Sequence, residues 1–146
     1  MERMGSRSAT DLLQLPVQLH GIRLGRPVDL LLAAAAWRVV GFVVLCGDDV
    51  ERFLAFAAAG PAAGEISVPS ALLLLEDVDF YRARSSSLRA LIGGTVSRAG
   101  DVLGSLSDVL VTDGGLVASL VVEQDDRPVE VEPAGVSIET ERLSAA

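Results

Sequence analysis

Few residues of this chain have the type and spacing that nucleophilic or acid–base catalysis requires. His20 is the only histidine, and it stands beside Gly21, a pair more typical of a turn than of a general base. Cys46, the only cysteine, lies in an apolar run with no cation next to it in sequence to favour the thiolate. A nucleophilic Cys46–His20 pair therefore rests on composition alone, and we expect Cys46 to be a small buried hydrophobic residue.

Two short carboxylate clusters are the candidates for a metal site. They are Asp48-Asp49-x-Glu51 and Glu76-Asp77-x-Asp79. Neither has the ligand spacing of a calcium loop, so we interpret each as a solvated turn. Gly93-Gly94 lacks the following lysine of a phosphate-binding loop. We expect no catalytic residues, no metal site and no bound cofactor.

The charge balance limits the choice of partner. The chain has 20 acidic and 12 basic residues, a formal net charge of −8, and every basic residue is an arginine. This balance opposes nucleic-acid binding, which depends on neutralising phosphates. Arg82, Arg84 and Arg89 could pair with an acidic partner, but we interpret them as part of a solvated linker. The abundance of alanine without lysine suggests a GC-rich bacterial source.

The location expected from the sequence is cytoplasmic. Residues 1–14 are polar and charged, without the apolar core of a secretory signal. Leu30 to Cys46 is the one segment that raises a membrane question, but Arg38 interrupts it and it is short for a spanning helix. Its valines and Gly41 favour strands, so membrane association is not expected.

Short aliphatic runs separated by turn residues predict an all-β fold. The predicted runs are 29–32, 37–46, 53–57, 66–75, 102–111, 116–122, 129–132 and 136–138. Asp113-Gly114-Gly115 predicts a hairpin, because glycine tolerates the positive φ of tight hairpin turns. Regularly spaced short strands are typical of small barrels and sandwiches. We divide the chain into a flexible tail (1–14), an N-terminal module (15–80), a linker (81–90) and a C-terminal module (91–146).

The two modules resemble each other in three places. Leu24 to Leu32 and Leu103 to Val111 both read Leu-Gly-x-x-x-Asp followed by three apolar residues. The other two matches are Gly41 to Val44 with Ala118 to Val121, and Ile66 to Ala71 with Val129 to Ala134. The glycine would permit a bend or bulge, and the aspartate could bond nearby backbone N–H groups. Their common order predicts an internal duplication.

The pattern over Leu91 to Leu143 resembles the PRC-barrel family. It is carried by Leu103-Gly104 through Asp108, the glycine turn before Leu116, and Val131-Glu132-Pro133. The likeness is weaker over Leu15 to Phe80, where Ala33 to Ala36 replaces the glycine turn. The resemblance implies two small antiparallel β-barrel modules, packed together.

The same resemblance implies a function through docking rather than catalysis. We therefore expect a non-catalytic adaptor that binds a protein partner. The alternatives are a ribosome-maturation-type factor that binds a ribosomal protein, and a small-ligand-binding barrel. Half of the residues are hydrophobic, more than two small barrels can enclose, so we also expect the halves to cover each other and the chain to form a homodimer.

Overall fold

The computed structural model describes residues 6–62 and 64–140, and most of them lie in β-strands. Residues 1–5 of the predicted tail and 141–146 of the predicted C-terminal module lie outside the described residues. The strands are β1 (Arg7–Ser8), β2 (Val17–Leu19), β3 (Ile22–Ala33), β4 (Arg38–Cys46), β5 (Glu51–Ala55), β6 (Gly60–Ala62), β7 (Glu65–Ser67), β8 (Ser86–Ser87), β9 (Thr95–Arg98), β10 (Asp101–Val111), β11 (Val117–Gln124), β12 (Arg127–Val131) and β13 (Val136–Glu139). The helical turns are α1 (Ala9–Leu12), η1 (Ala34–Ala36), η2 (Phe56–Ala58), η3 (Ala71–Leu73), α2 (Val78–Arg82) and α3 (Leu88–Leu91).

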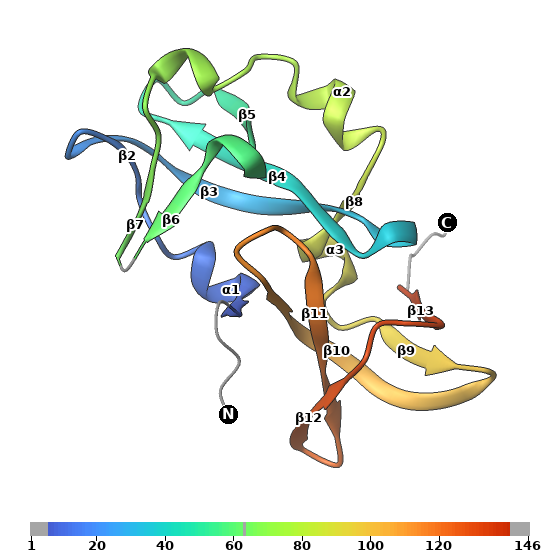
Figure 1. The fold of residues 1–146 in the computed structure, drawn as a ribbon. Coiled ribbons are helices and arrows are strands. Elements are labelled where there is room, and N and C mark those ends of the chain that lie inside the picture. Colours follow the sequence, from blue (N-terminus) through green and yellow to red (C-terminus); the bar gives the residue numbers. More distant parts are fainter. Residues whose placement is uncertain (1–5, 63, 141–146) are drawn as a thin grey trace.

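The strands form two sheets that lie against each other (Figure 1). The N-terminal sheet has the order β5-β4-β3-β2-β7-β6, with β8 also paired to β3. The C-terminal sheet has the order β12-β11-β10-β9-β13, with β1 also paired to β10. All pairs are antiparallel except β2–β7. The predicted all-β class, with two packed β-modules, is confirmed.

Leu30 to Cys46 forms a hairpin rather than a membrane span. It comprises the end of β3, the η1 turn and β4. Leu30, Leu32 and Val44 of this hairpin are fully buried in the protein core. Among the described residues, no helix is both long and apolar enough to cross a membrane.

The first predicted sequence match coincides with the strand registers. Asp29 lies opposite Val43, and Asp108 lies opposite Val121. In both strands a bulge immediately precedes the aspartate. Close strand contact also explains the shared glycine: a Cβ would lie 2.4 Å from the Leu45 carbonyl oxygen at Gly25 and 2.3 Å from that of Glu123 at Gly104.

The other two predicted matches are wrong. In the second, Gly41 pairs with Leu31 and Ser119 with Leu110, so Gly41 corresponds to Ser119 and the predicted alignment is off by one residue. In the third, β7 lies beside β2, whereas β12 lies beside β11 and so corresponds to β5. Aliphatic runs of similar composition gave a match between strands that hold different places in the two sheets.

The residues predicted as a tail carry an element that docks on the C-terminal sheet. We name residues 7–12, which form β1 and α1, the N-terminal arm. Ser8 caps α1, and its hydroxyl donates to the Asp108 carboxylate. The backbone N–H and the hydroxyl of Thr10 donate to the same carboxylate at 3.1 and 3.0 Å, and the Val109 N–H adds a bond of 2.8 Å.

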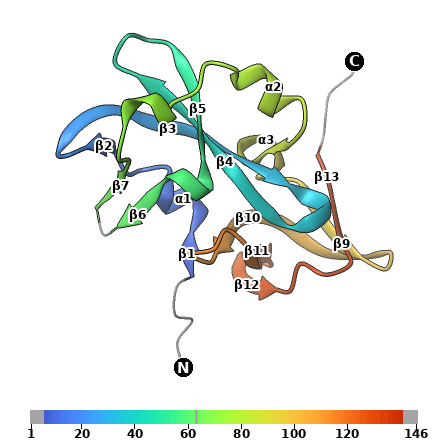
Figure 2. The same ribbon diagram turned by 45° about the horizontal axis from the view of Figure 1, so that its top comes forward.

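The end of the predicted linker (81–90), together with Leu91, forms a matching element that docks on the N-terminal sheet. We name residues 86–91, which form β8 and α3, the inter-module arm. Ser87 caps α3, and its hydroxyl donates to the Asp29 carboxylate. The backbone N–H groups of Arg89 and Leu30 donate to it at 3.1 and 2.8 Å. Each module is therefore completed by an arm that precedes the other one along the chain, and α1 and α3 lie between the sheets (Figure 2).

The hairpin tips of the two sheets also meet in a reciprocal contact. The Val39 N–H donates to the Gly115 carbonyl at 2.7 Å, and the Val117 N–H donates to the Trp37 carbonyl at 2.9 Å. Because Val39 and Val117 hold corresponding positions, this contact has approximate twofold symmetry. One continuous apolar cluster contains buried residues of both sheets and both arms, so the halves form one unit.

The outer face of the N-terminal sheet is covered by residues 68–85, which join β7 to β8 and which we name the connector. This face presents Leu31, Val43 and Phe53, which form a second small apolar cluster. Val78 and Tyr81 of α2 pack against it, and the Phe53 and Tyr81 rings stack with their centroids 3.8 Å apart. Part of the apolar surplus noted in the sequence is thus buried by the connector itself.

We predict that Gly115→Val destabilises the protein by about 2–3 kcal/mol, mainly through backbone strain. Gly115 has φ +90°, and a Cβ there would lie 3.1 Å from the Phe56 ring. The matched control is Gly114→Val, because Gly114 lies outside the left-handed region and the nearest atom to its Cβ would be Thr112 Oγ1 at 3.9 Å. Chemical denaturation measures both free energies of unfolding. Equal values would contradict the assignment of this turn.

We also predict that Asp29→Ala and Asp108→Ala each cost about 2–4 kcal/mol, because several part-buried donors lose a charged acceptor. A double-mutant cycle between Ser87 and Asp29 should show coupling of about 1 kcal/mol. The control cycle pairs Ser8→Ala with Asp29→Ala, two changes at separate caps, and should be additive. Coupling of equal size in both cycles would show that the arms do not act through these carboxylates.

Candidate functional site

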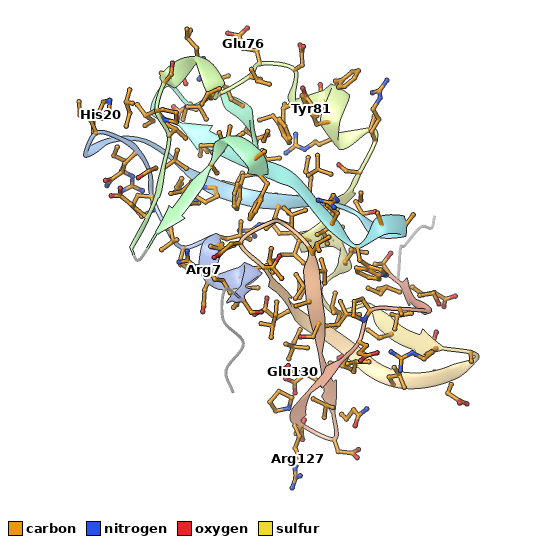
Figure 3. All side chains as sticks on the ribbon, viewed as in Figure 1. Arg7, His20, Glu76, Tyr81, Arg127 and Glu130 are labelled. Atoms are coloured by element: carbon orange, nitrogen blue, oxygen red, sulfur yellow. The ribbon has the colours of Figure 1, made fainter. Side chains whose placement is uncertain are left out.

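The structure keeps the candidate nucleophile and base in different settings. His20 is exposed in the turn between β2 and β3, with φ +51° (Figure 3). Cys46 is buried near the end of β4, opposite Gly25, and its sulfur lies 3.9 Å from the Val44 carbonyl. Cys46 packs in the main apolar cluster, as expected for a small hydrophobic residue.

The first carboxylate cluster is engaged with arginines. Arg52 donates to both oxygens of Asp48 at 3.0 and 2.9 Å. This bidentate bond holds the pKa of the Asp48 carboxyl below its ordinary value and raises the pKa of Arg52. Glu51 accepts a bond of 2.9 Å from Arg82. Within residues 6–62 and 64–140, no group of three or more His, Cys, Asp or Glu side chains is placed to hold a metal ion.

The three arginines assigned to a solvated linker make specific contacts. Arg82 joins α2 to β5 through Glu51. Arg84 lies over the Phe80 ring at 3.7 Å and donates to the Phe80 carbonyl at 2.9 Å. The Arg89 guanidinium donates to the Val28 carbonyl on the N-terminal sheet. These contacts within the protein therefore hold the connector and the inter-module arm in place, and the three side chains are not reserved for an acidic partner.

A depression of about 430 Å³ lies where β3 meets the turn after β4. Arg23 and Arg26 line it with exposed side chains, and Cys46 and Asp49 contribute to its wall. It is an open depression rather than an enclosed cavity, and its cationic groups stand in solvent. The arrangement offers weak attraction to an anion but no nucleophile paired with a base.

Residues 72–80 of the connector expose three large apolar side chains on one short segment. Leu72 is 86% exposed, Phe80 50% and Leu75 37%. Glu76, Asp77 and Asp79 are exposed on the same short segment, and the Asp79 side chain is 97% exposed. We name these six residues the connector ridge. It crosses the end of the N-terminal sheet above β5, with Glu76 pointing away from the body of the protein (Figure 3).

The connector ridge is held in place by contacts on both of its sides. Leu75 and Phe53 exchange two backbone hydrogen bonds of 2.7 and 2.8 Å, which add one bridge to the edge of β5. Ser70 accepts from the Leu72 N–H at 3.1 Å and caps η3. Tyr81 stacks on Phe53 at the other end. The exposed side chains thus project from a fixed backbone.

The sequence predicts an apolar run over 66–75 with a strand that ends at Pro69, since proline cannot donate to a ladder. In the structure β7 ends at Ser67, and the rest of the run forms η3 from Ala71 and the start of the ridge. The signal that could have revealed the surface is four leucines, Leu72 to Leu75, followed directly by carboxylates.

Comparison with known proteins gives no family assignment. No protein-family model matches the chain. No curated protein matches it either.

Proposed function

We propose that this chain is a non-catalytic protein-binding adaptor built from two diverged PRC-barrel-like modules, and that it docks to its partner through the connector ridge. The observation that carries this proposal is the exposure of Leu72 and Phe80 on a fixed backbone. Large apolar side chains in such positions lose solvent contact when a partner binds, which is favourable. A bacterial source belongs to the proposal on composition alone, and a cytoplasmic location belongs to it as an expectation from the sequence pattern.

A preformed ridge favours affinity because little ordering entropy is lost on binding. The connector is already fixed by the Phe53–Tyr81 stack and the Phe53–Leu75 bridge. Ordering a mobile loop at an interface reduces the binding free energy, and a connector that is already fixed avoids that cost. Aromatic and arginine side chains are enriched in interface cores, and Arg84 stacked on Phe80 supplies both at this surface.

The charge around the ridge indicates the partner's chemistry. The ridge carries three exposed carboxylates, Glu76, Asp77 and Asp79, against one arginine stacked on Phe80 and one 4.0 Å from Asp79, and the whole chain has a net charge of −8. Complementary potentials raise association rates and disfavour acidic partners. We therefore propose a protein partner with an apolar groove and a basic rim, and no nucleic acid. The ribosome-maturation and small-ligand alternatives have no separate observation in their favour.

The test compares two double variants that each remove two exposed apolar side chains. Leu72→Ser with Phe80→Ser removes the ridge contacts, whereas Ile22→Ser with Val102→Ser removes two exposed residues elsewhere, 65% and 70% exposed. A partner captured from the native host and then purified should bind the ridge variant at least about 30-fold more weakly, the effect of losing a binding hot spot. Calorimetry or surface plasmon resonance measures this loss.

The control variant should bind like the unmodified chain. Equal affinity of both double variants would contradict docking through the ridge. Turnover of a substrate by the purified chain would contradict the non-catalytic part of the proposal. Raising the salt concentration should weaken binding if the basic rim of the partner contributes.

A further inference from the structure

The two arms dock by the same set of contacts on different sheets. In each, a serine hydroxyl donates to the aspartate carboxylate and the backbone N–H two residues later donates to the same carboxylate. The serine oxygen also accepts from the N–H three residues later, from Asp11 in one arm and Ala90 in the other, at 3.2 Å in both. Two arms of different sequence thus share one docking mode.

The arms also share their apolar anchors. Ala9 and Leu88 directly follow the two serines, and both are completely buried. Leu12 is 1% exposed, and Leu91 packs partly buried against the same core. The common pattern is serine, an apolar residue, two variable residues and leucine. The arm with this pattern acts as the ligand, and the aspartate at a strand bulge marks the site that receives it.

The strands continue the docking by backbone pairing. Arg7 and Ser8 of the N-terminal arm pair with Val111 and Leu110 of β10. Ser86 and Ser87 of the inter-module arm pair with Leu32 and Leu31 of β3 in the corresponding register. Addition of a strand to a sheet is a general mode of peptide recognition, in which main-chain bonds give affinity and side-chain anchors give specificity.

The two arms differ in how they are tethered. The inter-module arm lies between α2, which packs on the N-terminal sheet, and β9 of the C-terminal sheet. Among the described residues, the N-terminal arm is joined to a packed strand on one side only, through residues 13–16 that lead to β2. Leu13 and Leu15 of this connection pack partly buried against the main core, and the Pro16 carbonyl accepts from the Ile66 N–H at 2.8 Å, so an exchanged arm would turn within residues 13–16 while α2 stays packed.

We propose that the arm site of the C-terminal sheet, formed by β10 around Asp108, also accepts the N-terminal arm of a second copy of this chain. The arm that fits the site within one chain fits it equally between chains, because exchange preserves every contact. Only the tether differs, so the exchange depends on chain concentration against the effective concentration of the arm on its own chain. This inference is independent of the connector ridge.

Cross-linking between two differently labelled full-length chains tests the exchange. One chain carries Arg7→Cys and the other Val111→Cys, with Cys46→Ala in both so that each has a single thiol. Arg7 and Val111 are direct partners in the β1–β10 pair, a spacing compatible with a disulfide. After incubation near 1 mM, roughly the effective concentration set by a short tether, oxidised glutathione should trap a mixed disulfide dimer.

The matched control replaces the Val111→Cys chain with Val102→Cys, whose side chain is 70% exposed and lies outside the β1–β10 pair. We expect about tenfold more mixed dimer with Val111→Cys than with this more accessible control. Mass spectrometry identifies the linked residues. Mixed dimer at or below the control level would overturn the proposal.

A second measurement avoids new thiols. A full-length chain with Ser8→Ala and Leu12→Ala has a weakened arm, and a peptide of residues 6–14 should raise its melting temperature by binding the folded state. The same peptide with alanine at the two positions should not, and Asp108→Ala in the chain should abolish the effect. If the weakened chain is folded by circular dichroism and the unmodified peptide gives no rise, exchange is refuted. If that chain is unfolded, the cross-linking result decides.

Discussion

The architecture depends on two carboxylates that each bind an arm belonging to the other half of the chain. Asp29 is 8% exposed, and a buried carboxylate without donors is costly. Asp29 and Asp108 sit at bulges, where the backbone N–H of the next residue turns toward the carboxylate. The arm supplies the remaining donors in each case. In neither sheet do the strands alone supply all the hydrogen-bond donors for the aspartate carboxylate. Each sheet needs the arm that belongs to the other half, so the two modules share one core.

The approximate twofold relation ends where the chain leaves the four common strands of each sheet. β7 runs parallel to β2, whereas β13 runs antiparallel to β9. The outer faces differ for the same reason. Phe53 lies under Tyr81 of the connector, and its counterpart in the C-terminal sheet is the exposed Glu130. The connector thus joins the modules, covers one apolar face and presents the connector ridge, while the C-terminal sheet has a charged residue in place of Phe53 beside the half-buried Leu110 and Val121.

The symmetric contact at the hairpin tips requires a positive φ at one position in each tip, and two very different residues adopt it. Gly115 has φ +90° and Trp37 has φ +48° at the corresponding position. A left-handed conformation costs a non-glycine residue about 1–2 kcal/mol. The Trp37 side chain packs partly buried against the main core, and this burial offsets the strain. The glycine turn of one half and the alanine-rich turn of the other therefore serve the same contact.

The sequence by itself determined the fold class, the Leu-Gly-x-x-x-Asp correspondence and the buried setting of Cys46. These follow from local pattern, because alternation, turn glycines and apolar runs act over a few residues. It misaligned the second match by one residue, since neighbouring valines and leucines are interchangeable in pattern. Only the tertiary structure decided that residues 7–12 and 86–91 cross between the sheets. The serine hydroxyls of these two segments find their acceptors only at Asp108 and Asp29, which are distant in sequence. The connector ridge was hidden for the same reason: Leu75 and Tyr81, which hold it, contact Phe53 of β5, which is distant in sequence.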